Sequence, residues 1–160
     1  MLNHFYQALT DIVEVIHRHG AINVVLSPGS RSAPLALSFM RNGKFDIYHI
    51  VDERSAAYFA LGLAKSSGRP SVLVCTSGTA ALNYAPAVAE AYFQEIPLLV
   101  LTSDRPIEWI AQNDNQAIFQ ENLYGKHALG FAQMPVSYSQ QEDYIFPIQK
   151  ENKMCALPLG

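Results

Sequence analysis

Four short polar segments are the candidates for chemistry, because each follows an apolar run that predicts a buried β-strand. They are residues 27–32 (SPGSRS), 52–54 (DER), 77–79 (SGT) and 103–106 (SDRP). In an open parallel sheet, ligands bind beside the carboxyl ends of the strands, where loops of this kind meet. The sequence therefore predicts that hydroxyl, carboxyl and guanidinium groups gather at one edge of a sheet.

Ser30 and Arg31 lie between a turn-forming Pro-Gly pair and the expected start of a helix. This arrangement offers a hydroxyl group, backbone N–H groups and a guanidinium group to a carboxylate or a phosphate. A structural interpretation has about equal support, because Ser32 is a suitable N-cap and Pro34 fits the first turn of a helix. The residues alone leave both interpretations open.

For Glu53 and Arg105, too, both a functional and a structural interpretation are possible. Acidic residues at a helix start are stabilised by the helix dipole in any protein, so capping by Asp52 and Glu53 is favoured when these residues are considered alone. Pro106 favours a directed Arg105 side chain, although surface arginines are far commoner than functional ones. The turn at 77–79 is typical of a simple connection between a strand and a helix.

The elements that must position these loops alternate along the chain. Apolar residues at helical spacing predict a first helix that ends near Gly20. Further helices are expected at about 34–40, 53–67 and 79–93, and strands at 22–26, 45–51, 71–76 and 98–102. This alternation predicts an α/β fold with a doubly wound, mostly parallel sheet and helices on both faces. One further strand is predicted at 131–138.

Composition narrows the classes of partner. The chain has 160 residues, 49% hydrophobic residues and a net charge of −3, which fits one globular domain without a basic stripe for nucleic acid. Its apolar runs are much shorter than the ~20 residues that span a bilayer, and no signal-peptide pattern is present. We therefore expect a cytoplasmic protein that binds neither nucleic acid nor membrane. Cys75 and Cys155 lack metal or redox spacing, which predicts reduced thiols.

Considered together, these segments resemble a known family. The order of DERSAA (52–57), TSGTAALN (76–83) and IPLLVLT (96–102) resembles the pyrimidine-binding domain of thiamine-diphosphate enzymes. The motifs SPGSRSAP (27–34), TSDRP (102–106) and NQAI (115–118) narrow the resemblance to 2-succinyl-5-enolpyruvyl-6-hydroxy-3-cyclohexene-1-carboxylate synthases of menaquinone biosynthesis. The resemblance covers about residues 1–138 and implies the thiamine-diphosphate-binding fold.

The resemblance also implies roles for particular residues. Glu53 would be the catalytic residue, facing N1′ of the cofactor's aminopyrimidine ring in a largely apolar pocket and sharing a proton with that nitrogen. Residues expected to contact the cofactor are Glu53, Thr76, Ser77, Gly78 and Asn83. Residues expected to bind substrate are Ser30, Arg31, Arg105, Asn115 and Gln116.

The family's reaction decarboxylates 2-oxoglutarate and adds the resulting succinyl-semialdehyde unit to isochorismate, with thiamine diphosphate and Mg²⁺ as cofactors. The resemblance implies a homo-oligomer, a dimer or a tetramer, with active sites shared between subunits. Residues of this chain are not expected to bind the metal or the diphosphate group, because the family's GDG…N motif belongs to a later domain that these 160 residues lack.

The sequence departs from the family pattern in its tail and in its length. We expect residues 1–138 to form the pyrimidine domain and residues 139–160 to be an irregular tail, a truncated or non-native end of that domain. A chain of this length is expected to be a fragment that is inactive alone. The alternatives are another thiamine-diphosphate carboligase or decarboxylase, or a non-catalytic anion-binding module of the same fold.

Overall fold

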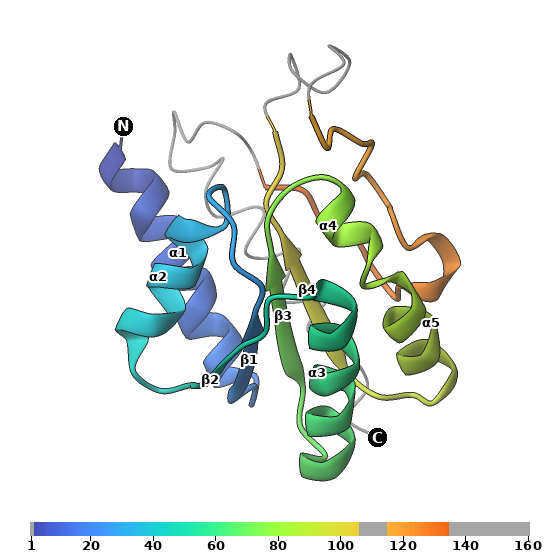
Figure 1. Ribbon diagram of the computed structural model, residues 1–160. Helices are drawn as coiled ribbons and strands as arrows, with labels where there is room; N and C mark the ends of the chain where they lie inside the picture. Colours follow the sequence, from blue (N-terminus) through green and yellow to red (C-terminus); the bar gives the residue numbers. More distant parts are fainter. Residues whose placement is uncertain (1, 106–114, 135–160) are drawn as a thin grey trace.

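A parallel β-sheet organises the part of the chain that the computed structural model describes, residues 2–105 and 115–134 (Figure 1). Strands and helices alternate from the N-terminus, as the apolar patterns predict. The elements are α1 (Leu2–Arg18), β1 (Asn23–Leu26), α2 (Ala33–Asn42), β2 (Asp46–His49), α3 (Glu53–Ser67), β3 (Ser71–Cys75), α4 (Thr79–Leu82), α5 (Ala85–Phe93), β4 (Leu98–Thr102) and the 3₁₀-helix η1 (Gly125–His127).

The strand order is β2-β1-β3-β4, and all three strand pairs are parallel. β1 pairs with β2 on one side and with β3 on the other, so Leu26 is opposite both His49 and Val74. The chain builds outward from β1 to β2 and then crosses back to β3. The carboxyl ends of β1 and β3 therefore flank the point where the direction of winding reverses, which is the usual ligand crevice of an open α/β sheet.

Helices cover both faces of the sheet, with α1 and α2 on one side and α3 and α5 on the other (Figure 1). Successive strand residues point to opposite faces, so Val24 packs with α1 and α2 while Val25 packs with α3. The buried strands need apolar residues on both faces, which explains the continuous apolar runs of β1 and β3. The predicted doubly wound α/β fold is confirmed.

The single helix predicted at 79–93 is wrong, because the chain divides it into α4 and α5. Pro86 lies in the first turn of α5, where it has no N–H to continue a helix from α4. Tighter bonds close the turn instead, with Tyr84 N donating to Ala81 O at 3.2 Å. The Ala81 carbonyl also accepts from the Tyr124 hydroxyl at 2.8 Å, so this carbonyl is satisfied at the interruption.

The strand predicted at 131–138 is not observed at 131–134, and 135–138 lie outside the described residues. Met134 packs against the core formed by α1, α2 and the sheet, whereas Phe131 is 45% exposed. Met134 is therefore partly buried by packing against the core, and it is not part of a strand.

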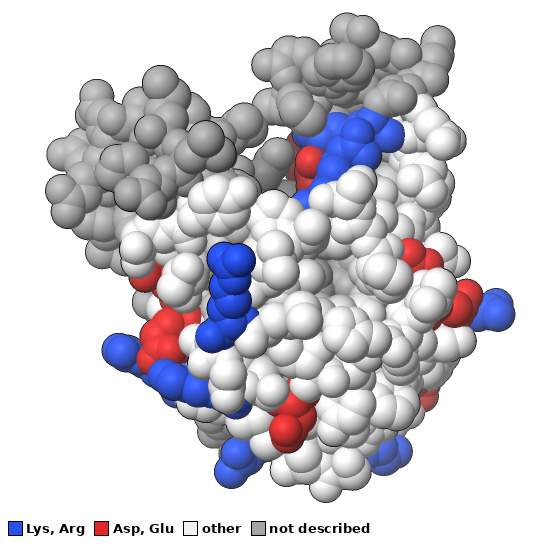
Figure 2. All heavy atoms as spheres, turned by 60° about the vertical axis from the view of Figure 1, so that its left-hand side comes forward, with Lys and Arg blue, Asp and Glu red and all other residues white. Residues whose placement is uncertain are grey.

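Acidic and basic side chains are interspersed over the face seen in Figure 2, which brings the α1 and α2 side forward. Glu14 on α1 accepts hydrogen bonds from Lys44 Nζ at 2.9 and 3.1 Å and from Arg18 Nε at 3.0 Å. These charges tie α1 to the segment that follows α2. No helix within residues 2–105 or 115–134 is both long and apolar enough to cross a bilayer.

Candidate functional site

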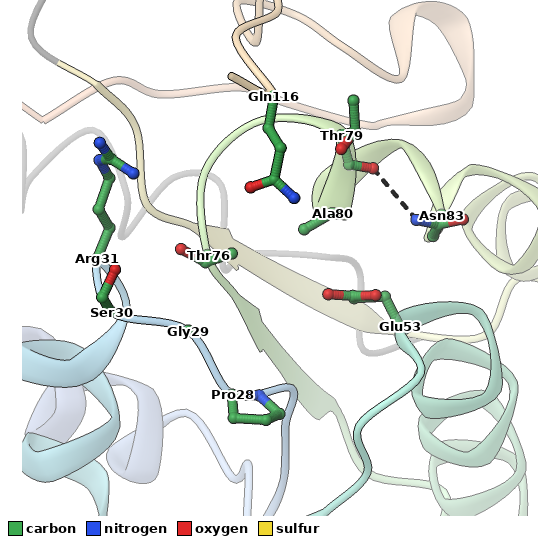
Figure 3. Close-up of a pocket in the computed structure, with 10 residues that line it drawn as sticks. All are labelled: Pro28, Gly29, Ser30, Arg31, Glu53, Thr76, Thr79, Ala80, Asn83 and Gln116. Atoms are coloured by element: carbon green, nitrogen blue, oxygen red, sulfur yellow. Dashed lines mark hydrogen bonds between the residues drawn. The ribbon is translucent and has the colours of Figure 1, made fainter. Parts of the chain in front are cut away.

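A cavity of about 350 Å³ opens at the carboxyl edge of the sheet, where the sequence predicts a site (Figure 3). Residues after β1, β2 and β3 form most of its wall, and Gln116 contributes from a later segment. The residues that line it are Pro28, Gly29, Ser30, Arg31, Glu53, Thr76, Thr79, Ala80, Asn83 and Gln116. The predicted residues Ser30, Arg31, Glu53, Thr76, Asn83 and Gln116 are thus brought together, whereas Ser77, Gly78, Arg105 and Asn115 do not line this cavity.

The loop after β1 crosses very close to the end of β3. A Cβ atom built on Gly29 would lie 2.7 Å from Thr76 Cγ2 and closer still to Thr76 Cβ, far inside van der Waals contact. Only glycine therefore allows the two segments to approach across the winding reversal. Ser30 and Arg31 follow directly and are exposed on the cavity wall.

Ser32 occupies the N-cap position of α2 but does not cap it through its side chain. Its hydroxyl donates instead to Gly29 O at 3.0 Å, which folds the loop back on itself. This bond helps to fix the loop that carries Ser30 and Arg31. The capping interpretation of this segment thus lacks its expected hydrogen bond.

The adjacent residues Asp52 and Glu53 have different structural roles. Asp52 is the N-cap of α3 and accepts a hydrogen bond from Ser55 N at 2.8 Å, and Ser55 holds the pKa of the Asp52 carboxyl below its usual range. Glu53 is the first residue of the helix, and its side chain points into the cavity (Figure 3). Capping is therefore met by Asp52, and the Glu53 carboxyl group faces the cavity.

The turn after β3 packs against the backbone of Gln116. Gly78 has a φ of 86°, and a Cβ atom there would lie 2.9 Å from Gln116 C and closer still to Gln116 O, so a side chain would meet both strain and a backbone clash. Thr79 N donates to that same carbonyl at 3.2 Å. Ser77 is buried, and the Thr79 carbonyl accepts from Asn83 Nδ2 at 3.2 Å (Figure 3). This turn thus presents Thr76, Thr79 and Asn83 to the cavity.

Gln120 was not foreseen from the sequence and is one of the few buried polar residues in the described part of the chain. Its Oε1 accepts from Gly78 N at 2.5 Å, and its Nε2 donates to Ser103 O at 2.9 Å and Thr102 Oγ1 at 3.2 Å. One amide side chain thus connects the turn after β3 with the end of β4. No local motif marks it, because its partners are distant in sequence.

Arg105 and Asn115 are neighbours. The Arg105 Nη2 donates to the Asn115 carbonyl oxygen, and Arg105 N donates to Asp104 Oδ1 at 2.7 Å. Burial raises the pKa of the Asp104 carboxyl above its usual range, against the opposing effect of Arg105. The guanidinium group thus holds the start of the segment that carries Gln116.

Neutral groups lie behind the cavity wall. Burial raises the pKa of the Cys75 thiol to about 12, with a smaller contribution from the negative charge of Glu53. Burial likewise raises the pKa values of the Tyr84 and Tyr124 hydroxyls. Cys75 is a free, protonated thiol, as expected from its apolar surroundings.

The wall itself is more polar than the sequence led us to expect. Hydroxyl, amide, carboxyl and guanidinium groups face the cavity, whereas only Pro28, Gly29 and Ala80 lack a polar side chain. The expectation of a largely apolar pocket is therefore not met by this part of the protein. Within residues 2–105 and 115–134, no three His, Cys, Asp or Glu side chains cluster as metal ligands would.

This arrangement can bind a ligand with both a basic nitrogen and an anionic group. Glu53 offers a carboxyl group as a hydrogen-bonding partner for a nitrogen, and Arg31 offers a guanidinium group to a carboxylate or phosphate. Figure 3 shows Glu53 at the start of α3 and Arg31 in the loop that follows β1.

Comparison with known proteins identifies the family of the chain. A family model described as thiamine pyrophosphate enzyme, N-terminal TPP binding domain, matches residues 7–125. The chain is 48% identical over 151 residues to a 2-succinyl-5-enolpyruvyl-6-hydroxy-3-cyclohexene-1-carboxylate synthase of Cytophaga hutchinsonii, an alignment that covers 94% of this chain and 27% of the relative.

Proteins of the same name from two other bacteria are also similar. Identity is 57% over 110 residues in Porphyromonas gingivalis, covering 69% of this chain and 19% of the relative. It is 51% over 146 residues in Listeria monocytogenes, covering 89% and 25%. The chain thus spans about a quarter of the length of the curated relatives it matches.

Proposed function

The chain belongs to the thiamine pyrophosphate enzymes, as an N-terminal TPP binding domain, and we propose that it forms the pyrimidine-facing wall of a synthase active site. The proposed reaction decarboxylates 2-oxoglutarate and joins the remaining four-carbon unit to isochorismate. The observation that carries this proposal is the division between Asp52, which caps α3, and Glu53, which faces the cavity.

The cavity residues fit the pyrimidine end of the cofactor. The Glu53 carboxyl group would hold a proton at the ring nitrogen N1′, and Thr76 and Asn83, which line the cavity, would shape the surface beneath the ring. Ser77 and Gly78 would contribute through the turn that holds these two residues in place. When bound, thiamine diphosphate supplies the nucleophile and the electron sink that decarboxylation of a 2-oxo acid requires. The task of this chain is to orient the ring and to move one proton.

Charge and hydrogen-bonding groups on the opposite wall suit dicarboxylate substrates. Ser30 and Arg31 line the cavity and offer a hydroxyl and a guanidinium group to a carboxylate. Gln116 adds an amide, and Arg105 with Asn115 supports the segment that carries it. These five residues are our proposed substrate-binding set.

The remaining parts of the site would come from elsewhere. The relatives are about three and a half times as long as this chain, which supports a diphosphate and Mg²⁺ site in regions beyond these residues. A homo-oligomer, a dimer or a tetramer, would complete each active site across subunits, in a cytoplasmic enzyme. Residues 1–138 would act as its pyrimidine domain. The 160 residues by themselves are then expected to be inactive.

The direct test uses the product of the complete coding sequence. With thiamine diphosphate and Mg²⁺, it should release CO₂ from 2-oxoglutarate and consume isochorismate in equal amounts. Pyruvate in place of 2-oxoglutarate separates the main alternative, because a monocarboxylate carboligase would accept it. Preference for pyruvate would overturn the assignment of substrates, and absence of any cofactor-dependent turnover would favour a non-catalytic module.

A further inference from the structure

We propose that Gln120 is a positioning residue, which holds the turn after β3 and the Gln116 segment in register so that Gln116 stays in the cavity wall. Its side chain is 7% exposed and does not line the cavity. The inference rests on the proposed function for its kinetic consequences, but its geometric content is independent of the reaction.

The Gln120 side chain is a double anchor. Gln120 Oε1 accepts from Gly78 N at 2.5 Å, while Nε2 donates to Ser103 O at 2.9 Å. Both partners are backbone groups at the carboxyl edge of the sheet, one after β3 and one after β4. A single side chain therefore fixes the separation of two segments that differ by 25 positions in sequence.

Gln116 contacts the same turn that Gln120 anchors. The Gln116 carbonyl accepts from Thr79 N at 3.2 Å and lies where a Cβ atom of residue 78 would be. Gln116 has a φ of 62°, a conformation that costs energy for a residue with a side chain. Such a conformation persists only when its surroundings hold it, and residues 116 and 120 contact the same turn, at Thr79 and Gly78. Loosening the Gln120 anchor should therefore release Gln116.

A positioning role for Gln120 differs measurably from a role in stability alone. If Gln120 only stabilised the fold, mutating it would have the same effect with and without the Gln116 side chain. A residue that acts through Gln116 should lose most of its kinetic effect once the Gln116 side chain is gone. That dependence is measured by a double-mutant cycle.

The test uses Gln120→Met, which keeps a similar length and volume but removes all three side-chain hydrogen bonds, in the product of the complete coding sequence. Loss of the anchor should lower kcat/KM for isochorismate about tenfold or more. In a Gln116→Ala background, the same change should lower it by less than about threefold. Equal factors in the two backgrounds would overturn the positioning role. Gln7→Ala, an exposed glutamine on α1, is the control and should leave the kinetics unchanged.

A readout without catalysis keeps this inference separate from the proposed reaction. In hydrogen exchange followed by mass spectrometry, Gln120→Met should speed deuterium uptake in peptides that contain residues 77–82 and 115–120, but not in those covering β3. Unchanged uptake in both segments would contradict the inference even in an active enzyme. If the wild-type protein lacks synthase activity, only the proposed function fails, and this measurement still decides the role of Gln120.

A second variant, Gln120→Glu, keeps the inference testable if Gln120→Met folds poorly. Gln120→Glu keeps an oxygen acceptor for Gly78 N but loses the donor to Ser103 O. It should show faster exchange at residues 115–120 than the wild type, with the turn at 77–79 less affected than in Gln120→Met. Exchange identical to the wild type at residues 115–120 would refute the anchor to Ser103.

Discussion

Gly29 and Thr76 approach so closely that a Cβ atom on the glycine would lie 2.7 Å from Thr76 Cγ2 and closer still to Thr76 Cβ. The contact joins the loop after β1 to the end of β3 and forms part of the cavity wall. Thr76 is β-branched and cannot swing away as a flexible side chain would. The shape of the site therefore depends on the absence of a side chain at position 29.

Gly29→Ala should thus destabilise the fold by roughly 1–3 kcal/mol through overpacking. The matched control is Gly62→Ala, because Gly62 lies inside α3 and a methyl group added there would have nothing within 4 Å. That change should stabilise the protein by roughly 0.5–1 kcal/mol, since alanine is the better helix former. Urea unfolding of both variants measures whether each change lowers or raises the free energy of unfolding. An unchanged midpoint for Gly29→Ala would contradict the close packing.

The ion pairs of Glu14 predict how the stability of the fold depends on pH. Hydrogen bonds from Lys44, Arg18 and Asn42 lower the pKa of its carboxyl from 4.5 to about 2. A lowered pKa in the folded state means that this carboxylate adds stability above pH 4.5, and that the contribution disappears as the pH falls toward about 2. Glu14→Gln should therefore be less stable than the wild type at pH 7, with the gap closing at low pH.

Thermal unfolding between pH 7 and pH 2 tests this prediction. Glu14 is partly exposed, so added salt should also narrow the gap at pH 7. A gap that is the same at every pH would show that the carboxylate charge of Glu14 contributes nothing through its partners.

Arg31 and Arg105 should matter more for substrate than for cofactor. Removing a charge-assisted hydrogen bond to a carboxylate typically lowers kcat/KM by about ten- to a hundredfold, so Arg31→Ala should show a loss in this range. Arg105→Ala should lower kcat/KM in the same direction, through the segment that Arg105 supports. Arg105→Ala should also loosen the segment after residue 115, because its guanidinium group bonds to Asn115 O.

The control for both arginines is Arg69→Ala, an exposed residue at the opposite end of α3 from the cavity. It should leave the kinetic constants for both substrates and the apparent affinity for thiamine diphosphate unchanged. Normal kinetics in both Arg31→Ala and Arg105→Ala would remove the proposed dicarboxylate site.

The strands and the edge that carries the cavity were predictable, and the reason is physical. β1 and β3 are buried on both faces, which requires the apolar runs seen in the sequence, and the residues just after them must then lie at one edge. The break between α4 and α5 was also encoded, at Pro86, but an alanine-rich pattern on both sides of it concealed the interruption.

Other features depend on contacts between distant segments or on the local geometry of a turn. Whether Asp52 or Glu53 caps α3 cannot be read from two adjacent acids, because the choice depends on which side chain reaches Ser55 N. Gln120 gives no local signal, since its partners are backbone groups after β3 and β4. A strand was predicted at 131–138, but in its described part, 131–134, Met134 packs onto the core without one.

The central claim is that Glu53 transfers a proton to the cofactor. This role differs from helix capping because it requires an acidic proton, which a glutamine side chain lacks. Glu53→Gln keeps the shape and a hydrogen bond but cannot exchange a proton, so turnover should fall by about 10²–10⁴-fold with little change in stability. Asp52→Ala should do the reverse, lowering the free energy of unfolding through loss of the cap while leaving the proton transfer intact.

The most direct measurement is exchange of the C2 proton of bound thiamine diphosphate for deuterium, followed by NMR after rapid quenching. It requires no substrate, so it isolates the proton transfer from substrate binding. We predict that exchange is slowed by about 10²-fold or more in Glu53→Gln and remains at the wild-type rate in Asp52→Ala. Exchange at the wild-type rate in Glu53→Gln would contradict the assignment of Glu53.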